Sequence, residues 1–70
     1  MRLSTRNQLP GIVTEVNLGT VMATVKVRLD GGDQIVTASI TKEAVEELGL
    51  TVGAATTVLV KSTDVMLAVD

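Results

Sequence analysis

The sequence contains no histidine, no cysteine and no aromatic residue, and it has a single proline among its 70 residues. Without cysteine there can be no disulfide, and a structural zinc site loses its usual ligands. Ser-His and Cys-His nucleophilic pairs are excluded as well. Sites for single-stranded nucleic acid combine a basic groove with aromatic stacking platforms, and a chain with net charge −2 and no aromatics lacks both. We therefore expect neither an enzyme nor a nucleic-acid-binding protein.

Long apolar runs are also missing. No stretch approaches the roughly 20 apolar residues that a membrane span requires. The N-terminal sequence MRLSTRN is not followed by the apolar core of a secretory signal. The expectation is a cytoplasmic protein with no membrane partner.

What the chain does contain is aliphatic: 46% of its residues are hydrophobic, drawn from Val, Leu, Ile, Ala and Met. The length allows one domain, residues 1–70. A domain this small buries only about 60% of the surface that its unfolded chain exposes. Since disulfides and zinc are excluded, oligomerisation is the expected reinforcement, with the surplus apolar residues at subunit contacts.

Alternation of apolar and polar residues is clearest over residues 20–29 and predicts a strand with one buried face. The NLG turn at 17–19 allows a positive φ at Gly19, and DGGD at 30–33 is typical of a hairpin. The last segment, DVMLAV, is apolar on both faces, which predicts contact with a second copy of the chain. Besides 20–29, we expect strands at 9–16, 35–40, 56–61 and 64–69.

A short helix is expected over KEAVEEL, residues 42–48, with Thr41 as N-cap and Gly49 as the stop. Val45 and Leu48 form an i, i+3 apolar pair that would dock it on the sheet. Five short strands with one helix between the third and fourth predict an all-β fold with one short helix. The pattern is that of an OB-like five-stranded Greek-key barrel, and an SH3-like barrel is the alternative.

Hydroxyl groups and cations stand near the predicted strand ends. Ser4 and Arg6 are two residues apart, so in an extended segment they project to the same side. Lys61 and Ser62 supply a second cation and hydroxyl, and Thr41 stands at the helix start. A tetrahedral oxyanion suits such a mixture of charge and N–H or O–H donors. The alternative interpretation is that these are ordinary surface groups.

Three stretches together resemble the molbindins, small molybdate-binding proteins often called Mop: residues 4–29, 40–50 and 60–67. The same unit recurs as the TOBE-type domain of molybdate regulators and of some transporter ATPases. The resemblance implies an OB-like barrel that assembles as a homohexamer, a trimer of dimers, and holds oxyanions between subunits. It implies molybdate or tungstate as ligand, no other cofactor, and a role in molybdenum storage, buffering or homeostasis. The alternative function is a structural or protein-interaction module with no specific anion ligand.

The resemblance also implies the ligands. Thr41 would lie near the main oxyanion site, and Asn7 would fix the backbone. Some regulator domains have an anion-binding serine at the position of Ala44, so here backbone N–H groups alone would serve on the helix side. A second class of site, near a threefold axis, would use backbone donors of Gly19, Thr20 and Val21. The ligands of the main site would be Ser4, Arg6, Lys61 and Ser62.

Overall fold

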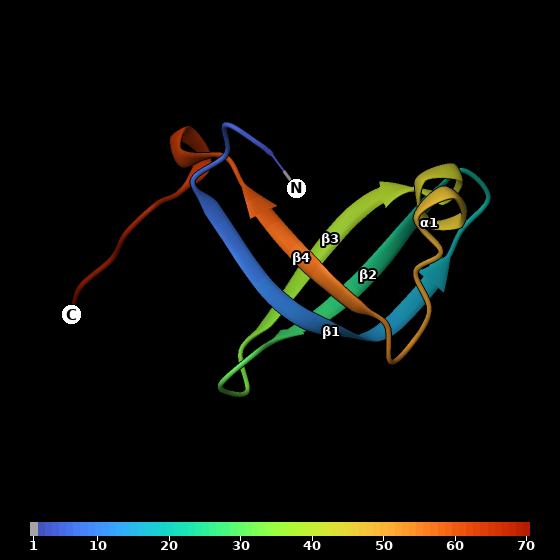
Figure 1. Ribbon diagram of the computed structural model, residues 1–70, viewed down its shortest axis with the longest axis horizontal. Coiled ribbons are helices and arrows are strands. Elements are labelled where there is room, and N and C mark those ends of the chain that lie inside the picture. Colours follow the sequence, from blue (N-terminus) through green and yellow to red (C-terminus); the bar gives the residue numbers. More distant parts are fainter. Residues whose placement is uncertain (1) are drawn as a thin grey trace.

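A computed structural model describes residues 2–70 as one antiparallel four-stranded sheet with one short α-helix (Figure 1). The strand order in the sheet is β3-β2-β1-β4. In this described part of the chain no helix is long and apolar enough to cross a membrane. The elements in chain order are β1 (Asn7–Leu18), β2 (Met22–Leu29), β3 (Ile35–Thr41), α1 (Lys42–Leu48), β4 (Ala55–Val60) and the 3-10 turn η1 (Ser62–Asp64).

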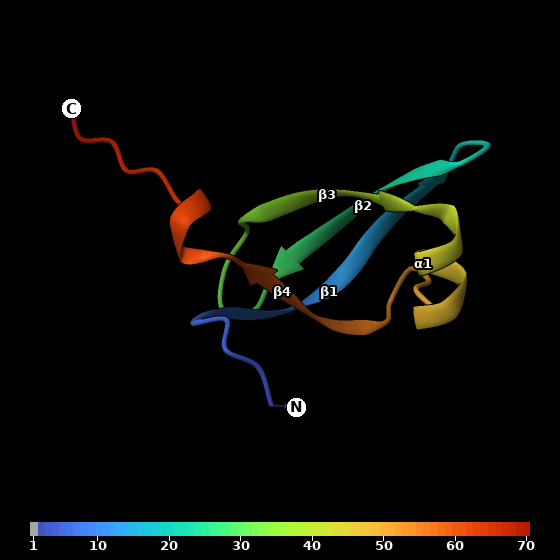
Figure 2. The same cartoon turned by 90° about the horizontal axis from the view of Figure 1, so that it is seen from above.

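Strand β1 is shared by both halves of the sheet. Its first half pairs with β4 and its second half with β2, and Gly11 faces a partner on each side. The register shifts between Val13 and Glu15, and the hydroxyl of Thr14, the extra residue, donates to the Lys26 carbonyl at 3.3 Å. Bulges of this kind increase strand twist. The sheet accordingly curls into a half-barrel rather than lying flat (Figure 2).

The core lies inside this curl. The alternation predicted for the second strand is confirmed, because Val25 and Val27 are buried while Lys26 faces outward. The strand begins two residues later than predicted, and Val21 is 68% exposed in the preceding turn. The buried apolar side chains that form this core are Val13, Ala23, Val25, Val27 and Val45.

The helix has the predicted bounds and caps. Thr41 accepts a hydrogen bond from the Ala44 amide at 3.0 Å, and Gly49 adopts φ 64° at the C-terminal end. Only Val45 is buried against the sheet, whereas Leu48 is 69% exposed. The prediction that both residues dock the helix is therefore wrong within one chain, because two turns of helix bring one side chain into this small core.

The expected strand at 64–69 is not formed within the chain. Residues 62–64 make a 3-10 turn, and residues 65–70 extend from the body without regular structure (Figure 2). Met66, Leu67 and Val69 are 91%, 94% and 97% exposed. A strand requires a hydrogen-bonded neighbour, and after the turn this segment has none. One chain thus forms a mostly β, curled four-stranded sheet with one short helix.

Candidate functional site

The beginning of β1 and the end of β4 meet at one end of the sheet. Asn7 faces Val60 in the antiparallel ladder, and the Asn7 Nδ2 group donates to the Val60 carbonyl at 3.0 Å. The Gln8 side chain donates to the Thr5 carbonyl at 2.8 Å. The expectation that Asn7 fixes the backbone is confirmed. Residues 4–6 are consequently held close to residues 61–63, which follow β4, at the end of the molecule away from α1 (Figure 1).

An open pocket of about 500 Å³ lies at this junction. It contains two cations and four hydroxyl side chains, and no carboxylate lines it. The four residues predicted as the main ligands all line it, although Ser4 and Arg6 lie more than fifty positions from Lys61 and Ser62 in the sequence. The lining residues are Ser4, Thr5, Arg6, Leu59, Lys61, Ser62 and Thr63.

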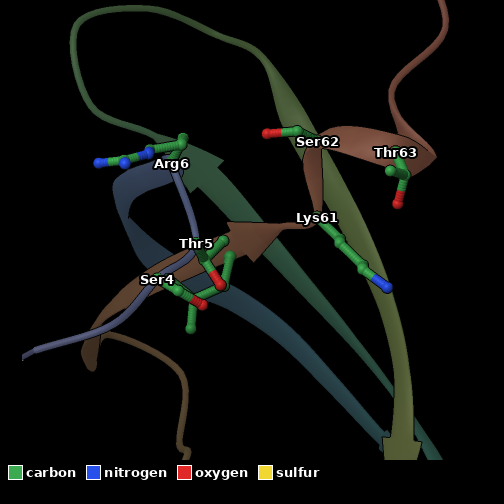
Figure 3. Close-up of a pocket in the computed structure, with 7 residues that line it drawn as sticks. Ser4, Thr5, Arg6, Lys61, Ser62 and Thr63 are labelled. Carbon is green, nitrogen blue, oxygen red and sulfur yellow. The ribbon is translucent and has the colours of Figure 1, made fainter.

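The two cations point away from each other. Figure 3 shows the Arg6 guanidinium on one side of the pocket and the Lys61 ammonium on the other. The Ser4 and Thr5 hydroxyls point to the same side, while Arg6 extends away from them. The extended-segment argument that aligned Ser4 with Arg6 does not hold here, because the backbone bends at both positions. One chain thus gathers the donors without aiming both charges at one point.

Neither cation is neutralised locally. Among residues 2–70 the one ion pair joins Lys26 to Glu15, at 3.9 Å, on the sheet surface. Arg6 and Lys61 are exposed and have no carboxylate partner in this part of the chain. The same residues contain no group of three or more His, Cys, Asp or Glu side chains arranged to hold a metal ion. The pocket is therefore suited to an anion.

Thr41 lies elsewhere in the single chain. It lines a second pocket, beside α1, together with Thr20 and Val21 of the β1–β2 turn. Its hydroxyl oxygen accepts a hydrogen bond from the Ala44 amide, so this oxygen is directed toward the start of the helix. The structure therefore groups Thr41 with the residues predicted for the second site and not with Ser4 and Arg6.

Gly19 has a different role from the one its sequence position suggests. Its φ is not positive, and its amide donates to the Met22 carbonyl at 2.8 Å. A Cβ at Gly19 would stand 2.8 Å from that same oxygen, so close backbone approach explains the glycine. The Gly19 amide, expected as a ligand donor, is engaged within the turn.

Sequence reasoning missed several lining residues. Thr5 and Thr63 belong to the first pocket, and Lys42, Glu43 and Glu46 belong to the second. Thr5 and Thr63 are each adjacent in sequence to a predicted ligand, and this adjacency could have indicated that they line the same pocket. The bends at residues 4 and 6 and the turn after Lys61, which bring them inward, were not readable from the residue pattern.

Comparison with known proteins gives the family. Residues 3–67 match the model of the TOBE domain. The chain belongs to the TOBE domain family. A relative of nearly the same length, molybdenum-pterin-binding protein 2 of Clostridium pasteurianum, is 48% identical over 67 residues. That alignment covers 96% of this chain and 97% of the relative.

Solved structures of similar proteins share the fold. An apo form of MopII from Clostridium pasteurianum superposes with a TM-score of 0.89 at 43% identity, covering 97% of this chain and all of that one. The cytoplasmic molybdate-binding protein ModG, in a form with molybdate bound, gives a TM-score of 0.82 at 45% identity. That match covers 89% of this chain and 43% of ModG.

Proposed function

We propose that this TOBE domain binds molybdate or tungstate in the pocket at the ends of β1 and β4. The observation that carries the proposal is the pocket itself: two unpaired cations and four hydroxyls, with no carboxylate. The similarity of the whole chain to ModG, described with molybdate bound, and to MopII supports that ligand. A doubly charged tetrahedral anion requires both positive charge and several separately directed donors.

The residue roles follow from donor chemistry. Arg6 presents a fixed fork of N–H groups and binds two oxygens of the anion. Lys61 contributes a point charge, and Ser4 and Ser62 rotate their hydroxyl groups onto the remaining oxygens. The anion is bound intact through these hydrogen bonds, with no bond from protein to metal. The chain acts as a binding protein and not as an enzyme.

The site is completed by a second copy of the chain. Within one chain Arg6 and Lys61 diverge, so Ser4 and Arg6 of one copy meet Lys61 and Ser62 of another across an interface. Thr41 approaches the same anion from a neighbouring copy, since in its own chain it lies beside α1.

The exposed tail supplies the contact between copies. β3 and β4 are the two edges of the sheet, and an apolar groove lies between them. Residues 65–70 of a second copy pair there as the fifth strand and close an OB-like Greek-key barrel. This removes both open edges and buries the exposed tail residues. We expect a homohexamer, a trimer of dimers, built from single-domain chains spanning residues 1–70.

In the cell this arrangement suits a cytoplasmic molybdenum store or buffer. Sites between subunits load and release an anion without covalent chemistry. No other cofactor, nucleic acid or membrane takes part in the proposed role.

Calorimetric titration with sodium molybdate, tungstate, sulfate and phosphate tests the proposal. A charge-assisted hydrogen bond contributes about 1.5–3 kcal/mol, which corresponds to about 10–150-fold in affinity. We expect Arg6→Ala to weaken molybdate and tungstate binding by that factor. The matched control is Arg28→Ala, because Arg28 is an exposed β2 residue that does not line the pocket.

Selectivity is the second part of the test. Sulfate is smaller than molybdate, so donors placed for the larger ion leave it with stretched hydrogen bonds, which weaken steeply with poor geometry. We expect sulfate and phosphate to bind at least about tenfold more weakly. Equal binding of all four anions, unaffected by Arg6→Ala, would instead support a structural or protein-interaction module with incidental cations.

A further inference from the structure

Thr5 is the most shielded donor of the pocket at the ends of β1 and β4. Of the six polar residues among 2–70 that line this pocket, Thr5 alone is half-buried, and the other five are exposed. Its hydroxyl group has no hydrogen-bond partner among residues 2–70. Polar groups that lose contact with water generally acquire a hydrogen-bond partner. The Thr5 hydroxyl is therefore available to donate to a molecule in the pocket.

The backbone of Thr5 is fixed by a neighbouring side chain. The Gln8 Nε2 group donates to the Thr5 carbonyl oxygen at 2.8 Å. Gln8 belongs to β1 and faces Leu59 of β4 in the antiparallel ladder, and Leu59 itself lines the pocket. The hydrogen bond thus ties Thr5, which precedes the first strand, to the paired part of the sheet. The side chain is restricted as well, because branching at Cβ limits the χ1 rotamers of threonine.

Ser4 and Thr5 present their hydroxyl groups on one side of the pocket (Figure 3). Adjacent residues of a regular strand point to opposite faces, and the bends at residues 4 and 6 remove that alternation here. Because each hydroxyl has one proton to donate, the pair supplies two separate hydrogen bonds to the oxygens of one tetrahedral anion.

We infer that Thr5 is a further anion-binding residue of this pocket and that Gln8 is its positioning residue. The inference rests on the proposed function, because it concerns the same ligand in the same pocket. The Thr5 hydroxyl donates to an oxygen of molybdate or tungstate beside the hydrogen bond from Ser4. Little conformational freedom is lost when the anion binds, since Gln8 already fixes the Thr5 backbone and the branched Cβ restricts the side chain.

Paired substitutions at Thr5 separate the hydroxyl group from the rest of the side chain. Thr5→Val keeps the size and the branching and removes the donor, whereas Thr5→Ser keeps the donor. In calorimetric titrations of the full chain with sodium molybdate, we expect Thr5→Val to bind about tenfold more weakly than the wild type, as for the loss of a hydrogen bond to a charged group. Thr5→Ser should stay within about threefold of the wild type, because the hydroxyl remains. The matched control is Thr24→Val, since Thr24 is half-buried in β2 and does not line the pocket.

The positioning role of Gln8 is tested by its dependence on Thr5. Gln8→Met keeps the length of the side chain and removes the donor, and Gln34→Met is the control because Gln34 is an exposed residue outside the pocket. We expect Gln8→Met to weaken molybdate binding by about threefold in the wild-type background. The loss should be smaller in the Thr5→Val background, because residues that act as a unit are not additive. An equal loss in both backgrounds would show that Gln8 does not act through the Thr5 hydroxyl.

The proposed main site and the present inference fail in different ways. Full molybdate affinity in Arg6→Ala contradicts the main site, whereas the comparison of Thr5→Val with Thr24→Val decides the role of Thr5 in either case. Wild-type affinity in Thr5→Val overturns the inference, and so does an equal loss in Thr5→Val and Thr5→Ser, which would report packing and not the hydroxyl. Circular dichroism and light scattering of the ligand-free variants should match the wild type. Loss of assembly in ligand-free Thr5→Val would also overturn the inference, because the hydroxyl would then serve the interface.

Discussion

At the scale of single residues, Gly11 allows β1 to lie close against β2. It is buried at the point where β1 pairs with both β2 and β4. A Cβ there would stand 2.5 Å from the Arg28 carbonyl oxygen and 2.8 Å from Val27 Cγ1. The first of these atoms belongs to the backbone and cannot rotate away. The close pairing of β1 with β2 at this point therefore requires a residue without a side chain.

We predict that Gly11→Ala lowers the free energy of unfolding by about 1–3 kcal/mol, the usual cost of overpacking. The matched control is Gly32→Ala in the β2–β3 turn, where an added Cβ meets nothing within 4 Å and φ is not positive. Urea denaturation followed by circular dichroism measures both. Equal stabilities of the two variants would show that the strands separate easily at Gly11.

Gly11 and Gly19 also show which structural reasons for a glycine can be predicted from the sequence and which cannot. Both are glycines because a carbonyl oxygen lies close to the Cα, at 2.5 Å and 2.8 Å from the position of a Cβ. Sequence reasoning predicted a turn at Gly19 but attributed it to a positive φ. At Gly11 the close oxygen belongs to the partner strand, so the contact is not visible in local sequence. At Gly19 it belongs to Met22 in the same turn, and at Gly49 the helix stop at φ 64° depends on the preceding helix, so in both places the local sequence predicted a turn or a stop.

At the scale of elements, α1 is a seven-residue helix that is held by its caps and by one buried side chain. Isolated helices of this length are unstable in water. The Thr41 hydroxyl satisfies the Ala44 amide, and Val45 reaches the core at 5% exposure. Each contribution therefore matters more than in a long helix.

We expect Thr41→Ala to destabilise the protein by about 1 kcal/mol through loss of the N-cap. Thr41→Ser keeps an acceptor oxygen and should lie close to the wild type. Thermal unfolding of both variants in ligand-free buffer isolates the cap from any effect on anion binding. A Thr41→Ala variant as stable as Thr41→Ser would mean that Val45 alone holds the helix.

The elements that could be predicted are those whose pattern is local. The alternation at 22–29 and the caps of α1 depend on neighbouring residues, and the structure confirms both. The segment 64–69 has strand-like composition, yet it forms no strand in one chain because pairing requires an edge that the local sequence does not specify. The pocket was predicted through family motifs, while Thr5 and Thr63 entered it through backbone bends.

At the scale of the whole molecule, the most exposed large apolar side chains lie in the tail. Val65, Met66, Leu67 and Val69 are between 46% and 97% exposed. The groove that could receive such a segment runs between β3 and β4 and is lined by residues such as Ile40, Leu50 and Val58. Patches of this kind mark interfaces.

We predict that deletion of residues 65–70 converts the assembly into smaller species. The reason is that the tail provides the apolar contact between copies, while the cations and hydroxyls of the pocket precede it in the chain. Multi-angle light scattering at micromolar concentration should show a mass of about six chains for the full protein and a clearly lower mass for the truncated one. A truncated protein of unchanged mass would place the interface elsewhere, for instance around the exposed Leu18 and Met22.

Ligand binding and assembly should be coupled because the site spans two copies. A ligand present at a hundred times its dissociation constant contributes about 2.7 kcal/mol per site. In a domain of this size, 1 kcal/mol moves the melting temperature by roughly 4–8 °C. We predict that molybdate produces a large rise in the melting temperature of the wild type and a much smaller one in Arg6→Ala, as measured by scanning calorimetry at fixed protein concentration.

Coupling between molybdate binding and assembly should also change the protein concentration at which the assembly dissociates on dilution. Without ligand, Arg6→Ala should remain as fully assembled as the wild type, since apolar burial by the tail and not Arg6 holds the empty interface. With molybdate, the wild type should dissociate at lower protein concentration than it does without it, and Arg6→Ala should show little change. A wild type that gains melting temperature without any gain in assembly would place all four main ligands within one chain. Lys61 would then have to turn toward Arg6 on binding, because the two now point apart.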